Sequence, residues 1–466
     1  MTRKLTLLLS LLVLASSVMF AQAKPGGIAR ELAMGASRID RNIAVNPFIV
    51  MDPSWLLANP AFLLKYSDYA WFDIAGGAVN GYGGENVYGN QFGGTSFSFG
   101  KELSVGAILS YDASVTNSLW TPLNTYIAHS TRAAANPAAG QGTPRAIEVF
   151  ELLAAFDMGG FQIGAGLSYG WSNQDFTNSP APPATNSSDG SLAAHMLGIR
   201  GGIRMDLGGG SAFEGAVAAR MDKATDKYSI GGAGNGTGSS EYGASTTELE
   251  VTARLPLHMS KRFTLVPYAA MRTYSIEPTE DGRLVGQAET KYSLKESILS
   301  LAFGVGGEVK VKEFLLAGGV SFATRRDKTE TNPNATATDK TTTVTSTITA
   351  VPVFNLGVEY PVLEWLTIRG GYYRAIANIG SKTAVDAGAS SETNLTMGNS
   401  SVSIGGYGPT ANDENGLMTL GVGLKFGAFA MDATVSEQAL RRGLGLIGSQ
   451  DNVNTFGYAT LSYCFE

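Results

Sequence analysis

The sequence predicts an all-β protein, an antiparallel transmembrane β-barrel of about 16 strands (about 14 as the alternative) with a small N-terminal plug. Three observations predict this fold. Segments of about ten residues alternate apolar with small or polar side chains, the connections between them alternate in length, and the chain closes on an aromatic segment with the same alternation. The composition agrees, because 58 Gly, 18 Tyr and 21 Phe accompany only 16% charged residues, whereas about 25% is typical.

The N-terminus has the pattern of a secretory signal peptide over residues 1–23. A basic start and an apolar run at 5–20 precede Ala21-Gln22-Ala23, which has the small-x-small form that signal peptidase cleaves. The run is shorter than the roughly twenty residues of a spanning helix, so an uncleaved anchor is the weaker interpretation. Lys24, rather than a Cys, follows the cleavage site and argues against a lipid anchor. We therefore expect export to the outer membrane of a Gram-negative cell.

Amphipathic strand patterns repeat from about residue 70 onward. At 161–171 the odd positions are apolar or aromatic and the even positions are Gln, Gly or Ser. The same alternation recurs at 249–257, 299–309 and 418–426. Such a strand has one face for lipid and one for a polar lumen, and its length is close to the about nine to eleven residues that a tilted bilayer crossing needs.

The connections sort into short and long by parity. Short ones predict seven hairpins, with turns at 99–103, 157–161, 206–212, 257–263, 309–314, 360–366 and 426–429. Long polar stretches intervene at about 113–145, 172–191, 222–243, 277–292, 325–342, 377–416 and 436–454. This pattern predicts short periplasmic turns, long external loops and an even strand number. A soluble sandwich or propeller is the alternative all-β fold, but it has no reason for such parity.

The last segment is expected to close the barrel. Leu461, Tyr463 and Phe465 share its outer face. The residues of the other face are expected to point into the lumen: Tyr458, Thr460, Ser462 and Cys464. Glu466 follows Phe465, whereas strands that the outer-membrane assembly machinery inserts often finish on the aromatic residue itself. We expect that machinery and outer-membrane lipid as partners, with the assembly signal left open.

A family resemblance lies before the first strand. The segment contains Ala33-Met34-Gly35-Ala36 and, within 52–63, the residues Asn59, Pro60 and Ala61. These motifs, over about thirty residues, resemble the long-chain fatty-acid transporter family of outer-membrane barrels and the related barrels of Bacteroidetes-type secretion systems. The resemblance implies a hatch or plug over residues 24–66, a barrel over 67–466, and a path for hydrophobic compounds around the hatch.

Three features depart from the family pattern. The acidic pair between the two motifs is reduced to Asp52, Asn46-Pro47-Phe48 is extra, and the family barrel has fewer strands than we count. A simpler interpretation of Asn59-Pro60-Ala61 is a turn, since Asn-Pro favours turn initiation. The sequence leaves the turn and the plug motif both open.

Little in the chain points to catalysis or to a metal. His129, His195 and His258 have no HxxxH or HExxH partner, and Cys464 is the only cysteine. Residues 166–170 match the G-x-S-x-G pattern of hydrolases, but Ser168 falls mid-strand, where a small lumen residue is the better interpretation. We expect no enzyme, cofactor or metal. The net charge of −6 without a basic stripe gives no support to a nucleic-acid partner.

Charged residues at lumen positions of four consecutive strands are candidates for selectivity. They are expected inside, because a charge facing the lipid midplane costs about 2–4 kcal/mol. Opposite charges on neighbouring strands either form cross-strand salt bridges or line a polar path, and the sequence leaves both open. The candidates are Arg200, Arg204, Asp206, Glu214, Arg220, Glu248, Glu250, Arg254 and Arg272.

Three functions follow as hypotheses. The first is passive transport of small, hydrophobic molecules across the outer membrane through a plugged barrel, with a small hydrophobic ligand as partner. The second is a general diffusion porin with a water-filled lumen. The third is a non-transporting scaffold barrel that presents its long loops to a secreted or surface partner.

Overall fold

The computed structural model describes residues 26–36, 46–75, 91–110, 148–178, 186–232, 238–280, 293–332, 341–385, 389–397, 417–435 and 456–465. The expected signal peptide at 1–23 and the expected loops at 113–145 and 436–454 lie outside these residues.

The described strands form one closed antiparallel barrel of sixteen strands, as predicted. Two of the sixteen are interrupted: β8 continues as β9 after Leu255-Pro256, and β15 and β16 pair with successive parts of β14. In chain order the strands are β1 (Tyr69–Ala75), β2 (Gln91–Phe99), β3 (Leu103–Ser110), β4 (Glu148–Asp157), β5 (Phe161–Asn178), β6 (Asn186–Gly208), β7 (Ser211–Gly232), β8 (Gly238–Arg254), β9 (Leu257–Ser260), β10 (Phe263–Glu280), β11 (Ser293–Val311), β12 (Phe314–Asn332), β13 (Thr342–Leu363), β14 (Leu366–Val385), β15 (Ala389–Met397), β16 (Leu417–Phe426), β17 (Phe429–Val435) and β18 (Phe456–Cys464).

The ring closes between its first and last strands. β1 pairs with β18 along its whole length, and β2 flanks β1 on the other side. The expected lumen side chains of β18 are buried, whereas Tyr463 on the opposite face is 43% exposed. Phe465 stacks on Phe97 of β2, with 5.5 Å between the ring centroids. The buried face carries Tyr458, Thr460, Ser462 and Cys464.

The seven predicted short turns are all present, but the predicted long loops are largely strand. β6 begins at Asn186 and β7 ends at Gly232, inside stretches expected to be loops. The expectation failed because these stretches lack apolar alternation, and alternation marks only strands with one dry face. Their Thr residues nevertheless favour extended backbone. A strand with water on both faces therefore looks like a loop in sequence.

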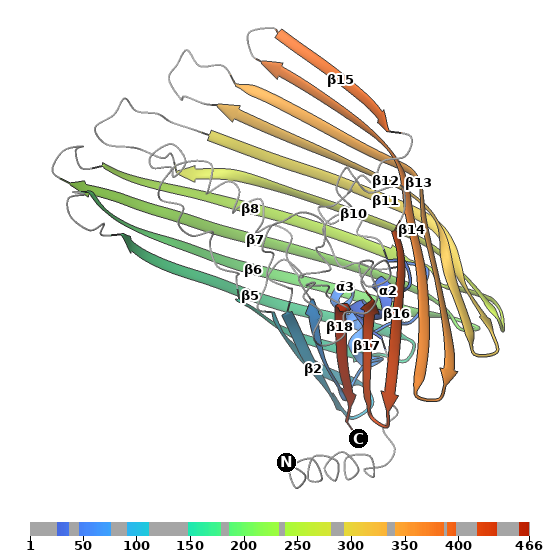
Figure 1. Cartoon of the computed structure of the whole chain (residues 1–466). Coiled ribbons are helices and arrows are strands. Elements are labelled where there is room, and N and C mark those ends of the chain that lie inside the picture. The colour runs from blue at the N-terminus through green and yellow to red at the C-terminus, as the bar shows by residue number, and fades with distance from the viewer. Residues whose placement is uncertain are drawn as a thin grey trace, which may run out of the picture.

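β13 shows where the wall changes character. Buried and exposed side chains alternate from Ala350 toward the turn. From Thr342 to Thr349, by contrast, every side chain is partly exposed to solvent. The strand has 22 residues, or about 73 Å at 3.3 Å per residue, and the apolar band of such barrels is only about 25 Å tall. The far half of the long strands therefore projects beyond the apolar band. Figure 1 shows β5–β8 and β10–β15 reaching well past the ends of β16–β18.

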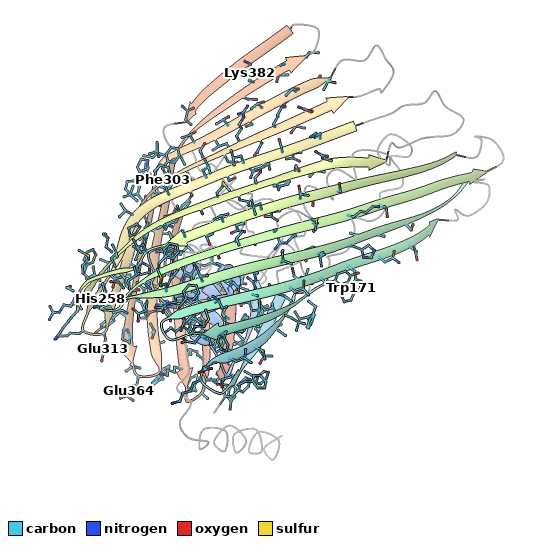
Figure 2. The ribbon with its side chains drawn as sticks, turned by 180° about the vertical axis from the view of Figure 1, so that it is seen from behind. Trp171, His258, Phe303, Glu313, Glu364 and Lys382 are labelled. Carbon is cyan, nitrogen blue, oxygen red and sulfur yellow. The ribbon has the colours of Figure 1, made fainter. Side chains whose placement is uncertain are left out.

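Exposed apolar side chains form a belt on the outer surface of the barrel, in the half nearest the short turns. On β11, Leu301, Phe303 and Val305 are 37%, 56% and 51% exposed, whereas the intervening Ala302 is buried. An outward apolar face is the reverse of a soluble sandwich. In Figure 2, His258, Glu313 and Glu364 lie at the turn end, Lys382 lies at the far end, and Phe303 lies between them.

The described part of the chain holds three short helices, α2 (Ile28–Ala33), α3 (Trp55–Ala58) and the 3-10 helix η1 (Pro60–Leu64). No described helix is long and apolar enough to cross a membrane.

Candidate functional site

Residues 26–36 and 46–66 lie inside the barrel, against its lumen face. α2 contacts β14 and β16–β18, and η1 contacts β3–β6, so the segment touches two separate parts of the wall. Leu56, Phe62 and Leu63 are fully buried in one cluster with Trp71 and Leu153 of the wall. Burial of each such side chain contributes roughly 1.5–3 kcal/mol. Figure 1 shows α2 and α3 enclosed by the strands near β16–β18.

The Ala-Met-Gly stretch lies directly on wall backbone. Asn355 Nδ2 donates to the Gly35 carbonyl at 2.7 Å, and Thr419 Oγ1 donates to the Ala33 carbonyl at 3.0 Å. A Cβ at Gly371 would lie 2.1 Å from the Gly35 nitrogen. A glycine is required there because the two backbones approach so closely. The motif therefore docks on β13, β14 and β16.

Asn59-Pro60-Ala61 both turns and docks. The Asn59 Oδ1 accepts from the Ala61 N–H at 2.9 Å and so caps η1. Its Nδ2 donates to the carbonyls of Ile203 and Gly215 at 3.0 and 3.2 Å. A Cβ at Gly164 of β5 would lie 2.3 Å from the Ala61 nitrogen. The Asn59 amide oxygen therefore makes the turn, and the amide nitrogen contacts the wall.

A buried ionic network holds the start of the segment. Arg30 bonds Asp52 of the same segment and Glu359 of β13, each at 2.7 Å. Arg369 of β14 bonds Glu359 at 2.6 Å and Asp432 of β17 at 2.5 Å. Removing one partner of a buried pair costs about 3–5 kcal/mol, because the other charge is left uncompensated. The sequence analysis noted only Asp52 of these five, although the three wall residues also lie at lumen positions of their strands.

Arg254 of β8 is the second anchor. Its guanidinium donates to the carbonyls of Ile49 and Val50 at 2.7 and 3.2 Å and to Glu214 at 2.5 Å. It also lies over the ring of Trp55. This lumen candidate is thus engaged in holding residues 46–55 of the segment.

Most of the other lumen candidates form ion pairs across neighbouring strands. Glu248 of β8 bonds Arg220 of β7 at 2.9 Å and also Arg272 of β10. Glu214 of β7 lies 3.5 Å from Arg204 of β6. This arrangement corresponds to the salt-bridge alternative.

The remaining three candidates are Asp206, Glu250 and Arg200. Asp206 is exposed at the turn between β6 and β7, where its Oδ1 accepts from the Gly208 N–H at 2.8 Å. Glu250 lies opposite Arg272 in the β8–β10 register. Arg200 bonds Glu151 of β4 and donates to a carbonyl of α3.

Glu151 is a lumen charge that the sequence analysis missed. Its neighbours on the lumen face of β4, Leu153 and Ala155, are apolar because they pack near the N-terminal segment. With both faces apolar, β4 shows no alternation, and the lumen side could not be recognised. Strand pairing identifies Glu151 as a lumen residue, since it lies opposite Ser168, a lumen residue of β5.

A cavity lies between the N-terminal segment and strands β4–β8, β10 and β11. The segment contributes Pro47, Trp55, Leu57 and Ala58 to its lining. The wall contributes mainly small or apolar side chains, among them Met196, Ala216, Ala218, Tyr268, Ala270 and Ala302. Five of the nine candidates also line it: Arg200, Arg220, Glu250, Arg254 and Arg272.

Glu31 is a buried acid within the segment. Its Oε2 accepts from the Asn46 N–H at 2.8 Å, and its Oε1 accepts from the Ser54 hydroxyl at 3.3 Å. Burial, together with the charge of nearby Asp52, raises the pKa of Glu31 well above its ordinary value despite these hydrogen bonds. Packing of the segment is therefore coupled to a proton.

Ser168 lies in the middle of β5 and lines the cavity. A G-x-S-x-G nucleophile sits instead at a strand-to-helix elbow. Within the described ranges, no group of three or more His, Cys, Asp or Glu is placed to hold a metal ion.

Comparisons with known proteins give two kinds of likeness. The model of the autotransporter β-domain family matches residues 150–373, just under half of the chain. A search of curated proteins finds no match.

Several solved barrels are similar over most of the chain, at low identity. The toluene transporter TodX of Pseudomonas putida is 12% identical, covering 95% of this chain and 98% of its own, with a TM-score of 0.33. A FadL homologue of Pseudomonas aeruginosa is 12% identical, covering 96% and 99%, with a TM-score of 0.32. The translocator domain of the autotransporter NalP from Neisseria meningitidis is 12% identical, covering 68% and 86%, with a TM-score of 0.26. Likenesses of this size do not assign the chain to either group.

Proposed function

We propose that this protein is an outer-membrane channel for the passive passage of small, hydrophobic molecules. Residues 24–66 are its hatch, and the lumen cavity is where such a molecule is held. The observation that carries the proposal is the largely apolar lining of that cavity, between the segment and the wall. The apolar belt supports membrane lipid as a partner, and the aromatic closing strand supports the assembly machinery as another.

The lumen contacts favour this function over a general porin. Open porins have a water-filled, polar interior, whereas here a segment anchored by Arg254, Asn59 and Arg30 occupies part of the lumen. The family resemblance of the Ala-Met-Gly and Asn-Pro-Ala motifs points the same way, since both motifs make the closest backbone approaches to the wall.

Two measurements on the same proteoliposomes test the proposal. Swelling in arabinose or raffinose reports a water-filled pore, and equilibration of the apolar dye 1-N-phenylnaphthylamine into dye-free inner vesicles reports apolar passage. We expect no swelling and accelerated dye passage relative to protein-free vesicles. Rapid swelling with both sugars would establish the porin instead.

A scaffold barrel that presents surface structure to a partner is the second candidate. It is favoured by the polar far halves of β5–β14, which passage through a membrane does not require. The match of residues 150–373 to the autotransporter β-domain model covers the same strands.

Dye passage separates the two functions, and shortening one outer hairpin tests whether the far half of the barrel contributes to it. Lys227 and Glu241 are partners in the β7–β8 register, so residues 228–240 can be replaced by Asn-Gly, which closes a two-residue hairpin. Under the transport function, dye passage is unchanged by this replacement. Under the scaffold function, vesicles show no protein-dependent dye passage with either chain.

A further inference from the structure

The charges around the lumen cavity cancel one another. Its lining contains four arginines. Four glutamates face them: Glu151 bonds Arg200, Glu214 bonds Arg254, Glu248 bonds both Arg220 and Arg272, and Glu250 lies opposite Arg272. An anion entering the cavity would meet guanidinium groups that already face carboxylates, although Arg200 Nη2 and Arg220 Nε have no hydrogen-bond partner among the described residues. The cavity therefore offers no net charge to an ionised ligand.

Ser300 of β11 brings an unused hydroxyl to this cavity. Its side chain is 3% exposed, lines the cavity, and its Oγ has no hydrogen-bond partner among the described residues. Its register neighbours are Arg272 of β10 and Arg325 of β12. Arginine only donates hydrogen bonds, so neither neighbour can accept the Ser300 proton. The Oγ itself has less than 1 Å² of accessible surface, so a ligand acceptor reaches this proton only after the neighbouring side chains shift.

Trp55 brings a second unused donor. Trp55 belongs to the cavity lining, and its ring is held against the Arg254 guanidinium. Its Nε1 has less than 1 Å² of accessible surface, so a ligand reaches it only after a small shift of the lining. The side chain is 6% exposed, and its Nε1 has no acceptor in the described part of the chain. A buried N–H without an acceptor costs about 1–3 kcal/mol, and a ligand that supplied an acceptor would remove that cost.

We propose that the cavity binds uncharged, largely apolar compounds that carry a hydrogen-bond acceptor such as a ketone, ether or ester oxygen. Ser300 Oγ and Trp55 Nε1 are the donors, and the alanine-rich wall contacts the apolar frame. This rests on the proposed function and adds the ligand class. It excludes both the plain hydrocarbon and the carboxylate as preferred ligands.

Three probes of one shape test the ligand class. Benzophenone has a carbonyl acceptor, diphenylmethane replaces it with CH2, and diphenylacetate carries a negative charge. Calorimetric titration of the protein in lipid nanodiscs, corrected with empty nanodiscs, gives a Kd for each. One added hydrogen bond predicts about threefold to tenfold tighter binding of benzophenone than of diphenylmethane. Diphenylacetate should bind most weakly of the three.

The donors are tested by Ser300→Ala, which removes the hydroxyl at nearly constant volume, and by Trp55→Phe, which removes the N–H together with part of the ring. Together they should bring the benzophenone preference, which is the ratio of the diphenylmethane Kd to the benzophenone Kd within each variant, close to one, because the ring area lost in Trp55→Phe weakens both probes alike. Ser104→Ala is the matched control, because Ser104 is a buried serine of β3 outside the cavity lining. It should change nothing.

The outcomes separate this inference from the function beneath it. Equal binding of benzophenone and diphenylmethane, or a preference that survives the double variant, overturns the donor assignment and leaves hydrophobic transport standing. Tightest binding of diphenylacetate overturns the neutral ligand class. No binding by any probe, with no dye passage, removes the transport function itself.

Discussion

The Arg254 guanidinium carbon lies 3.3 Å from the ring centroid of Trp55. The two residues come from β8 and α3, so their stacking joins the wall to the segment inside it. The same guanidinium reaches the carbonyls of Ile49 and Val50 and the carboxylate of Glu214. The segment is therefore held at this point by one guanidinium group, whose face stacks on Trp55 and whose N–H groups donate hydrogen bonds in the plane.

Arg254→Lys should loosen the segment while keeping the charge. A lysine ammonium cannot stack on Trp55 and reach three acceptors at once, because it lacks the planar fork. We expect the amides of residues 46–57 to exchange hydrogen about tenfold faster, equivalent to ~1.4 kcal/mol, as measured by mass spectrometry in detergent. Arg262→Lys, at an exposed turn, is the control and should leave those rates as they are. Unchanged exchange in Arg254→Lys would show that the apolar contacts alone hold the segment.

Asn59→Asp distinguishes the two roles of Asn59. Aspartate keeps the capping oxygen for Ala61 but turns an oxygen toward the carbonyls of Ile203 and Gly215, where Asn59 donates. A turn alone predicts that Asn59→Asp is neutral and Asn59→Ala costs about 1 kcal/mol. Docking predicts that Asn59→Asp destabilises at least as much as Asn59→Ala, measured by urea unfolding in lipid vesicles. The reverse order would reduce the motif to a turn.

The barrel was predictable because lipid outside and small or polar side chains inside impose alternation on each crossing. Leu301, Phe303 and Val305 show this rule on β11. Alternation is absent where both faces of a strand have the same surroundings. Residues Thr342–Thr349 face water on both sides, and β4 faces apolar groups on both sides. In each case the two faces of the strand are alike in polarity, so no period of two appears.

The lumen anchors were only partly predictable. Parity placed Arg254 and Glu214 inside, but it could not say that Arg254 bonds the carbonyls of residues 49 and 50, since those contacts join chain positions about 200 residues apart. Gly164 lies at a lumen position of the 161–171 alternation, and no sequence pattern singled out Gly371. Their purpose is visible only when Gly164 meets Ala61 and Gly371 meets Gly35.

Gly164→Ala should displace the Asn-Pro-Ala turn. The new methyl would lie 2.3 Å from the backbone nitrogen of Ala61, which cannot move without moving η1. Gly201, on β6, is the matched control, because a Cβ there would meet nothing closer than 3.9 Å. We expect faster hydrogen exchange of residues 55–66 and quicker dye passage in Gly164→Ala but not in Gly201→Ala. Faster exchange without quicker passage would separate the segment from the transport path.

Glu31 should make the segment more stable in acid. Because the pKa of Glu31 is raised in the folded state, chiefly by burial, its ionisation opposes packing. The stabilisation is fully present below the ordinary glutamate pKa and is lost as pH rises through the raised value. Protection of residues 26–36 should therefore fall from pH 5 to pH 8 in the wild type. In Glu31→Gln, which cannot ionise, the fall should be smaller. An equal fall in both would assign the pH dependence to other groups.

Phe303→Arg tests where the belt lies. Phe303 is 56% exposed on the outer face of β11, and an arginine facing the middle of the bilayer costs about 2–4 kcal/mol. Thr347→Arg lies in the wet half of β13, where every side chain is intermediate, and should change stability by no more than about 0.5 kcal/mol. Urea titration of folding into lipid vesicles measures both. If the two variants are destabilised equally, the boundary between belt and projection is not at Ala350, and the long strands cross the membrane elsewhere.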